Sequence, residues 1–573
     1  MKKILVLITV ILVVVTGKAQ FNSENINSQS TNKTLGKICY DNNGNIILTG
    51  TFSTSLTLGS YTVTNNTPYN PSGQSQMAAW IAKKSLGGNI LWATTINLMA
   101  LPDYSSSVYI FGSSTDAAGN TYVTGTFWGK INFGSIILTS TKLGSAYTQD
   151  MFTAKISPNG IFQWAKLEGT AEETWWGGEP GISVTTDVQG NVYTTGRMVL
   201  KILKNTGNCS YSPNSPVFCI YIVKYNPLGV KVWEKKFAPA QPSRTICGYQ
   251  HLNYGTAINS DGSNIYVAGV FYSTVSFGGV NLSTGSDTIR NAFLLKLNQA
   301  GTTIWARSVT GSANGGAEHL LLDNNGNDIY LAGGFPYGTI SFGGPAVTAN
   351  APTRYLAKYN STGTCSWAVT SGIDDARYAG PFKHPNGTIG MLLVSPNLIS
   401  SSPTYFGIKE FSPVDGSIIN STDASINAPF ISSGESIGSV PTGFIYSQSL
   451  KGTYDIGGNT VSSTQAVESN YSDLTLVTYT VPTPPAARQE MITKEIASSD
   501  IVLYPNPASN EITLRNNSDK ILGNLTLYDV SGKMIYRKFI GNSQATIDVK
   551  NFSSGFYYIR SDELQATIKF IKR

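Results

Sequence analysis

The chain has 573 residues, with 40 Lys and Arg against 34 Asp and Glu, a formal net charge of +6. This length predicts two or more folding units, and the modest charge without any basic run argues against nucleic acid as a partner. Only 13% of residues are charged and 57 are Gly, a composition typical of a secreted all-β protein rich in turns.

Residues 1–19 predict a signal peptide. Lys2 and Lys3 precede an apolar run at 4–15 that only Thr9 interrupts, and Gly17 and Ala19 are the small residues expected before a cleavage site. The run is too short for a stable membrane span, and no other segment approaches that length. We therefore expect no transmembrane segment in the mature chain.

Five cysteines occur, at positions 39, 209, 219, 247 and 365. An odd number excludes complete pairing within one exported chain. Cys39 and Cys365 lie in strand-like runs and are expected to be buried, whereas a disulfide between Cys209 and Cys219 would close a Pro- and Ser-rich loop. None has the spacing of zinc ligands, and we predict neither a metal nor a cofactor.

A turn phrase recurs along the chain: Asp, a short run of small and polar residues containing Gly or Asn, then an apolar strand that ends in Gly, as at 41–50. Asp accepts backbone N–H bonds at the start of such a turn, and Gly takes the position that needs φ > 0. Further copies lie at 116–125, 187–196, 261–269 and 323–333, with weaker ones at 384–390 and 441–446.

A second phrase follows each turn phrase, and a third closes most of the units. One is a strand-like run ending in Lys, at Lys83, Lys155, Lys224, Lys296, Lys358 and Lys409, and at 476–478 without Lys. The other is Gly-x-x-x-Trp, ending at Trp92, Trp164, Trp233, Trp305 and Trp367, with a degenerate copy at 416–419. Because the Lys keeps a fixed phase, we expect it to point outward or to bond a neighbouring turn rather than to bind an anion.

Units of four or five short strands at a period of roughly 50–75 residues predict a β-propeller of about seven blades over residues 20–480. There are seven turn phrases but only six Trp-type strands. If each Trp strand belongs to the following blade, the first blade lacks such a strand. Residues 21–30 are candidates to supply it, or the ring closes unevenly. The phrases resemble the SBBP-type β-propeller repeat, which implies an extracellular setting and carries no catalytic residues.

The loop at 167–179 contains the adjacent acids Glu172 and Glu173 close to the adjacent tryptophans Trp175 and Trp176. Apolar sugar faces stack on aromatic rings while carboxylates bond hydroxyls, so the loop suits sugar binding. Paired acids at the right separation also hydrolyse glycosides, and alternatively the tryptophans pack beneath their own loop. The candidate ligand-binding residues on this side of the ring are Glu172, Glu173, Trp175, Trp176, Tyr249 and Tyr254.

The remaining candidates for chemistry are weak. His251, His319 and His384 are far apart and have no metal-ligand spacing, so structural or surface roles are expected. The Asp turns lack the further oxygens and the final Glu of a calcium loop, and they are expected to be plain turns.

Residues 481–499 are rich in Pro and Ala, then charged and aperiodic, and indicate a linker. Short alternating strands follow up to the C-terminus and predict a small Ig-like β-sandwich over 500–573. They are expected at 501–504, 511–515, 525–528, 533–537, 545–549, 556–560 and 566–571.

The tail carries Leu-Tyr-Pro-Asn-Pro at 503–507, then characteristic segments at 527–533, 554–559 and 569–573. In this order they resemble the type A sorting domain of the type IX secretion system of Bacteroidetes. The resemblance implies export to the cell surface, recognition by the translocon and its sorting peptidase, and removal of the tail, often with attachment to lipopolysaccharide. It implies as recognised positions Pro505, Pro507, Gly532, Lys533, Gly555, Lys569, Lys572 and Arg573.

The sequence thus predicts a secreted or cell-surface β-propeller that acts as a binding or adhesion module for an extracellular glycan or protein, and not an enzyme. Two alternatives stay open: a carbohydrate-active enzyme that uses the 167–179 loop, and a structural surface protein without a ligand.

Overall fold

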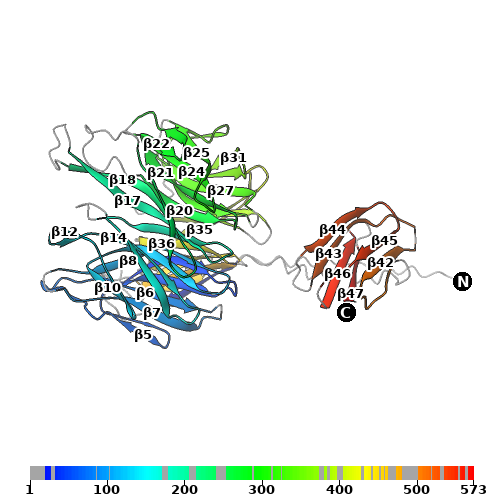
Figure 1. Cartoon of the computed structure of the whole chain (residues 1–573), viewed down its shortest axis with the longest axis horizontal. Helices are drawn as coiled ribbons and strands as arrows, with labels where there is room; N and C mark the ends of the chain where they lie inside the picture. Colours follow the sequence, from blue (N-terminus) through cyan, green and yellow to red (C-terminus); the bar gives the residue numbers. More distant parts are fainter. Residues whose placement is uncertain are drawn as a thin grey trace. The chain divides into compact units, whose positions relative to one another are not determined.

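The structure is a computed structural model in which the described residues form 47 β-strands and no helix, so none of them belongs to a helix able to cross a membrane (Figure 1). The chain divides into two compact units, one from Gly17 to Thr483 and one that includes Pro484–Arg573. The structure describes residues 20–26, 33–85, 87–101, 104–170, 178–204, 214–239, 253–286, 289–311, 314–323, 326–372, 380–383, 387–395, 404–426, 431–440, 443–450, 453–456, 459–462, 473–480, 501–517, 519–529, 534–552, 555–561 and 566–572.

The larger unit is built from seven antiparallel sheets, each with a core of four strands. The first four sheets consist of β2 (Lys33–Tyr40), β3 (Ile46–Phe52), β6 (Ala78–Lys84) and β7 (Ile90–Leu98); β8 (Ser107–Thr115), β9 (Thr121–Trp128), β14 (Asp150–Ile156) and β15 (Phe162–Glu168); β16 (Gly181–Thr186), β17 (Val192–Lys204), β18 (Asn214–Tyr225) and β19 (Lys231–Phe237); and β20 (Tyr254–Ser260), β21 (Asn264–Tyr272), β24 (Arg290–Asn298) and β25 (Thr303–Gly311).

The last three sheets consist of β26 (Gly316–Leu322), β27 (Asp328–Phe335), β30 (Thr353–Asn360) and β31 (Cys365–Thr370); β32 (Pro381–Lys383), β33 (Ile389–Ser395), β34 (Thr404–Phe411) and β35 (Ile418–Ile426); and β36 (Ile431–Val440), β37 (Gly443–Leu450) and β40 (Asp473–Thr480) with β1 (Gln20–Ile26). The first strands of successive sheets contact one another in the order β2, β8, β16, β20, β26, β32 and β36, and β36 contacts β2.

The N-terminal strand completes the last sheet rather than the first. Gln20 pairs with Thr480, and the antiparallel register continues to Ile26 opposite Leu474. The assumption that each Trp strand belongs to the following blade is therefore wrong: each pairs with the Lys-type strand of its own repeat, as Trp92 does with Lys83. The sheet without a Trp strand is the seventh, and β1 takes that place.

Most strands outside the four-stranded cores form short hairpins. The hairpin of β10 and β11 joins the sheet of the preceding repeat through β7, and that of β28 and β29 joins through β25, which makes two sheets six-stranded. The strands are β4 (Ser55–Leu58), β5 (Tyr61–Thr64), β10 (Lys130–Phe133), β11 (Ile136–Thr139), β12 (Lys142–Leu143), β13 (Ala146–Tyr147), β22 (Thr274–Phe277), β23 (Val280–Ser283), β28 (Gly338–Ser341), β29 (Ala346–Ala349), β38 (Thr453–Ile456) and β39 (Asn459–Ser462).

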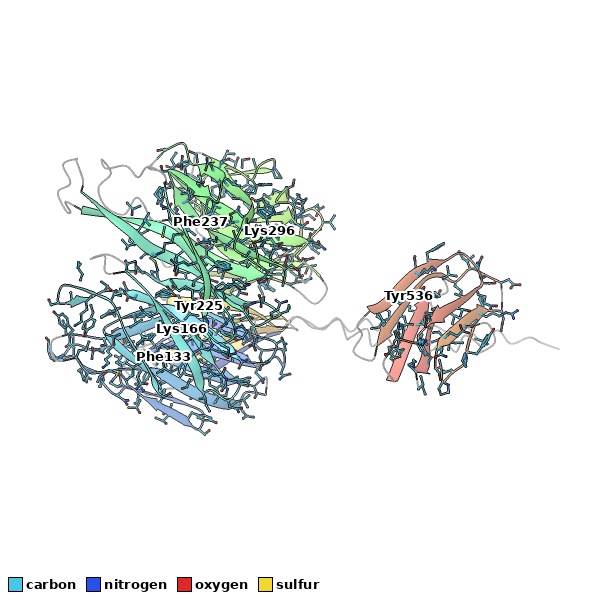
Figure 2. The ribbon with its side chains drawn as sticks, viewed as in Figure 1. Phe133, Lys166, Tyr225, Phe237, Lys296 and Tyr536 are labelled. Carbon is cyan, nitrogen blue, oxygen red and sulfur yellow. The ribbon has the colours of Figure 1, made fainter. Side chains whose placement is uncertain are left out.

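The middle strands of the sheets are buried on both faces, which explains their near-continuous apolar sequences. Every residue of β3 and β6 is buried, as are most of β21 and β24. Side chains fill the space between the sheets (Figure 2). The ring of Phe133 packs edge-on against that of Phe152, and the ring centroids of Phe237 and Phe277 are 5.1 Å apart. Burial of this apolar surface is the main contribution that stabilises the unit.

The turn phrases form the predicted tight turns. Asp41 Oδ1 accepts hydrogen bonds from the backbone N–H groups of Asn43 and Asn45 at 2.9 and 2.8 Å, and Gly44 takes a φ of +77°. The same geometry recurs at Asp187 and Gly190.

The Lys and Trp phrases fasten each sheet to the next. Trp164 Nε1 and Lys155 Nζ, opposite one another in adjacent strands, both donate to the carbonyl oxygen of Pro227 in the following sheet, at 3.1 and 3.5 Å. The pattern repeats with Trp233 and Lys224 on Gln299, Trp305 and Lys296 on Ser361, and Trp367 and Lys358 on Pro413. The expectation that the recurring Lys bonds a neighbouring turn is confirmed.

The smaller unit contains seven strands in two sheets that share one apolar core, which includes Leu514, Leu525 and Phe570. One sheet has the order β41-β42-β45 and the other β44-β43-β46-β47. The strands are β41 (Ile501–Tyr504), β42 (Glu511–Asn516), β43 (Gly523–Asp529), β44 (Met534–Ile540), β45 (Gln544–Asp548), β46 (Gly555–Ser561) and β47 (Ala566–Lys572).

Candidate functional site

A β-bulge interrupts the first strand of the first five sheets at the same level. In four of these strands one residue has no partner on the second strand: Phe111, for example, lies between Ile110, which pairs with Gly125, and Gly112, which pairs with Thr124. In β2 two residues, Gly36 and Lys37, lie between the paired Leu35 and Ile38. We call one residue from each bulge, Lys37, Phe111, Ile182, Thr256 and Glu318, the bulge ring. Bulges are common next to functional sites because they re-aim a side chain out of the pleat.

The Gly that ends each turn phrase lies opposite the bulge. A side chain on Gly125 would collide with the carbonyl oxygen of Tyr109, and one on Gly333 with that of Gly316. Glycine is required here because the bulged backbone approaches too closely for any Cβ. The sequence therefore contained a signal for the bulges, because a Gly that recurs inside a strand pattern indicates a bulge or a close approach of two backbones.

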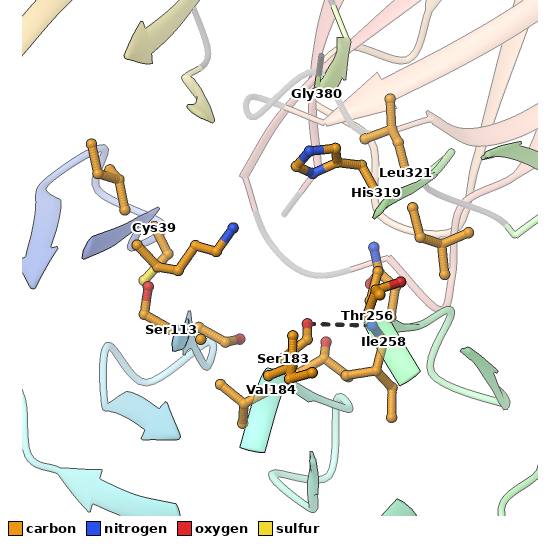
Figure 3. Close-up of a pocket in the computed structure, with 18 of the residues that line it drawn as sticks. Cys39, Ser113, Ser183, Val184, Thr256, Ile258, His319, Leu321 and Gly380 are labelled. Atoms are coloured by element: carbon orange, nitrogen blue, oxygen red, sulfur yellow. Dashed lines mark hydrogen bonds between the residues drawn. The ribbon is translucent and has the colours of Figure 1, made fainter. Parts of the chain in front are cut away.

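All five residues of the bulge ring line one cavity of about 500 Å³. Its walls are the first strands β2, β8, β16, β20 and β26, with Pro381 of β32. Figure 3 shows these strands around an open centre, with the His319 ring projecting into it and a hydrogen bond from Ile258 N to Ser183 Oγ between two neighbouring walls, 3.3 Å long. A cavity of this size accommodates a small-molecule ligand.

Two charged side chains line the cavity, Lys37 on β2 and Glu318 on β26. Glu318 binds Arg354 through an ion pair of 2.5 Å between Oε1 and Nη1. Burial lowers the pKa of the Lys37 ammonium, and the charge of Glu318 only partly opposes this shift. Burial, and then the positive charges of Lys37 and Arg354, lower the pKa of His319 to about 3. His319 is therefore neutral at physiological pH, a residue for which the sequence predicted no part in a site.

Acidification should destabilise the protein through His319. Its folded pKa of about 3 lies below the ordinary value of 6.5, so the unfolded chain binds more protons between these values and stability falls as pH drops from 6.5. We expect the free energy of unfolding to decrease by no more than about 1.4 kcal/mol per pH unit. The decrease should be smaller than this limit, because water in the cavity screens the charge of a protonated His319.

Urea denaturation at several pH values measures this dependence. The substitution His319→Gln should flatten the curve below pH 6.5 relative to the unmodified protein. Curves of equal slope would show that His319 titrates normally and that burial and the charges of Lys37 and Arg354 do not hold it neutral.

Most of the predicted ligand-binding residues lie outside the described residues: Glu172, Glu173, Trp175, Trp176 and Tyr249. Tyr254 is placed at the start of β20, half-buried, with the Arg197 guanidinium 6.0 Å from its ring centre. The proposal that these residues share one binding surface therefore stays a prediction.

The residues on either side of the 171–177 segment are firmly held. The buried Glu179 accepts hydrogen bonds from Thr170 N and Thr170 Oγ1, both at 2.7 Å, and from Val199 N at 2.8 Å. Burial raises the pKa of Glu179 to about 7 while these bonds oppose the shift. The carboxylate thus ties the two ends of the segment to β17.

Cys39, Cys219 and Cys365 are free thiols. Cys365 is buried, while Cys39 is half-buried and lines the cavity. Cys219 is buried, and burial raises the pKa of its thiol to about 12. Cys209 and Cys247 lie outside the described residues. Because Cys219 is a free thiol, the predicted disulfide between Cys209 and Cys219 is not formed in the structure. Within the part of the chain that is described, no group of three or more His, Cys, Asp or Glu is arranged to hold a metal ion.

In the smaller unit, two ends of the predicted sorting signal meet. Pro505 and Pro507 are exposed between β41 and β42, and Asn506 Oδ1 accepts a hydrogen bond from Ile571 N at 2.9 Å. Ala508 N donates to Ile571 O at 2.7 Å, and Gly555 pairs with Lys572 across β46 and β47.

Lys569 pairs with Tyr558 in the same two strands. Gly532, Lys533 and Arg573 lie outside the described residues.

This domain decides where the protein goes. Residues 502–573 match the family model of the secretion system C-terminal sorting domain. The chain therefore carries a sorting domain. It is secreted to the cell surface, and its C-terminal domain interacts with the type IX secretion system. The identification as an SBBP-type repeat stays a prediction.

Other comparisons are more distant. An uncharacterised WD repeat-containing protein of Acanthamoeba polyphaga mimivirus is 26% identical over 41% of this chain, which spans 18% of that relative's length. A protein of unknown function from Dyadobacter fermentans is 8% identical with a TM-score of 0.35, covering 80% of this chain and 99% of its own.

PorZ, described as a surface component of the type IX secretion system of Porphyromonas gingivalis, is 11% identical with a TM-score of 0.27, covering 94% of this chain and 81% of its own.

Proposed function

We propose that this protein is a secreted binding module, a seven-bladed β-propeller that presents the cavity of the bulge ring at the cell surface. The observation that supports binding is the bulge ring itself. Each of the first five sheets contributes a residue at its bulge to the lining of the same cavity, and the residue type differs in every sheet although the surrounding turns and clasps repeat. A repeat fold can form a site for a particular ligand only if the residues that line the site differ between the repeats, while the residues that hold the strands in place stay the same.

The seven-bladed arrangement rests on the sheets and their contacts. Each of the seven sheets has four core strands, and the chain of contacts between first strands returns from β36 to β2. Pairing of β1 with β40 joins the two ends of the repeat region in one sheet, which protects an edge that would otherwise be open.

The route to the surface is proposed from the sorting domain. After export by a signal peptide and the type IX translocon, a sorting peptidase removes the tail and the propeller attaches to lipopolysaccharide of a Bacteroidetes cell. There it binds an extracellular glycan or protein. The carbohydrate-active alternative depends on Glu172 and Glu173, which the structure leaves undescribed, and we do not extend the proposal to catalysis.

A glycan array probed with the mature chain tests the binding role. Phe111 lines the cavity and is 37% exposed, so Phe111→Ala should weaken binding by about tenfold or more by removing a stacking surface. The matched control is Ile137→Ala, because Ile137 is a 48% exposed apolar residue on β11 that does not line the cavity.

Equal loss of binding in both variants would contradict a role for the cavity. Binding that survives Phe111→Ala and disappears in Trp175→Ala would move the site to the 167–179 loop. Cleavage of a bound glycan that Glu172→Ala or Glu173→Ala abolishes would support the enzyme instead, and a chain that binds nothing would support the structural surface protein.

A further inference from the structure

Two charged side chains line the cavity, the cation Lys37 and the anion Glu318, while His319 is neutral. Glu318 is already bound to Arg354 at 2.5 Å. No ion pair joins Lys37 to an acid in the described ranges, and Glu318 acts on it only as a nearby charge. An ammonium withdrawn from bulk water without a bonded anion is costly, so a ligand that supplies one gains binding energy.

The walls next to Lys37 carry two apolar residues of the bulge ring. Phe111 and Ile182 occupy the bulges of β8 and β16, the two first strands that follow β2. The Phe111 ring lies nearly parallel to that of Tyr109, with centroids 6.5 Å apart, and still exposes 37% of its surface. One ligand can therefore bond Lys37 and cover Phe111 and Ile182, because the three side chains come from consecutive strands of one cavity.

We propose that this cavity binds a small molecule with a carboxylate and an apolar face, the carboxylate on Lys37 and the apolar face on Phe111 and Ile182. A carboxylate matches the single charge of the Lys37 ammonium, whereas a phosphate dianion is usually held by Arg forks or several backbone N–H groups. Hydroxyl groups of Ser113 and Thr185 on the same walls offer further bonds. This inference rests on the proposed binding function and narrows its ligand.

Two matched pairs of probes test the charge requirement by calorimetry on the mature chain. N-acetylphenylalanine and its uncharged amide represent a peptide C-terminus, and glucuronate and glucose represent an acidic sugar. In at least one pair the carboxylate should bind about tenfold or more tightly than its neutral partner. The pair that shows this preference identifies the source of the ligand.

Substitution of Lys37 locates the charge. Lys37→Met should abolish the preference for the carboxylate and leave binding of the neutral partner unchanged. Lys37→Arg keeps the positive charge and should retain the preference. If it does, the effect of Lys37→Met comes from loss of the charge and not from loss of folding. Lys142→Met removes an exposed Lys on β12 that does not line the cavity, and it should behave as the unmodified protein.

Three results would overturn the inference: equal binding within both pairs, binding of none of the four probes at millimolar concentration, or a carboxylate preference that persists in Lys37→Met. Glycan-array binding lost in Phe111→Ala would still support the proposed function in each of these cases. A carboxylate preference without any array binding would instead support the inference and exclude the arrayed glycans as ligands.

Discussion

A chain that ends at residue 485 should remain in the periplasm, whereas the full chain reaches the cell surface. The truncation lies just beyond the compact unit Gly17–Thr483 and removes the whole sorting domain at 502–573. Because no strand of the larger unit pairs with a strand of the smaller one among the described residues, we expect the shortened protein to fold. Cell fractionation and digestion of intact cells by an added protease measure the surface fraction.

A point variant separates the sorting surface from the bulk of the domain. Asn506→Ala removes the acceptor that holds Ile571 N, a bond worth about 1 kcal/mol, and should reduce the surface fraction by loosening the Pro505–Pro507 segment from β47. Glu511→Ala, at an exposed position at the start of β42, is the control and should be exported normally. Surface display of the chain ending at 485 would show that export does not require the sorting domain.

Gly363→Ala should destabilise the larger unit far more than Gly343→Ala. Both glycines have positive φ, +79° and +86°, so each substitution costs about 1 kcal/mol of backbone strain. A Cβ on Gly363 would lie 2.9 Å from Trp305 Cδ2, whereas one on Gly343 would meet nothing within 4 Å. The crowded site should add about 1–3 kcal/mol because Trp305 is held by its bond to Ser361 O. Urea denaturation followed by tryptophan fluorescence gives both free energies.

The same clasp permits a double-mutant test. Trp305→Ala alone should cost about 3–5 kcal/mol, since the ring is buried between two sheets. In that background the added cost of Gly363→Ala should fall to that of Gly343→Ala, because no ring remains to collide with the new methyl group. Equal costs of the two glycine substitutions in the unmodified protein would mean that the ring shifts freely and that the clasp is not rigid.

Much of the fold was predictable because it depends on short-range chemistry. The Asp turns require an acceptor at their start and a Gly with positive φ, as Asp41 and Gly44 show. The strands of the tail alternate and are bounded by turn residues, and all seven are present. The error over the Trp strands arose because sequence order does not tell which sheet a strand joins: Trp92 pairs back to Lys83, and β1 pairs with a strand at the other end of the repeats.

The candidate site was not predictable in the same way. Its residues are separated by about one repeat each, and they share no residue type, so composition does not mark Lys37, Phe111 and Glu318 as neighbours. Their similar distance from the turn Asp shows only that they occupy similar places in their own repeats. Even the Gly opposite each bulge indicates only that the backbone is close, and not which side chain the bulge turns inward.

The sequence by itself determined the repeat, its turns and clasps, and the sorting domain that sends the protein to the cell surface. These features depend on residues close together in the chain or on a whole domain of matching sequence. Only the tertiary structure decided how the first strands meet around one cavity and which charges face each other within it. Cross-strand register, bulge position and contacts between sheets determine that arrangement, and they bring together residues that lie hundreds of positions apart.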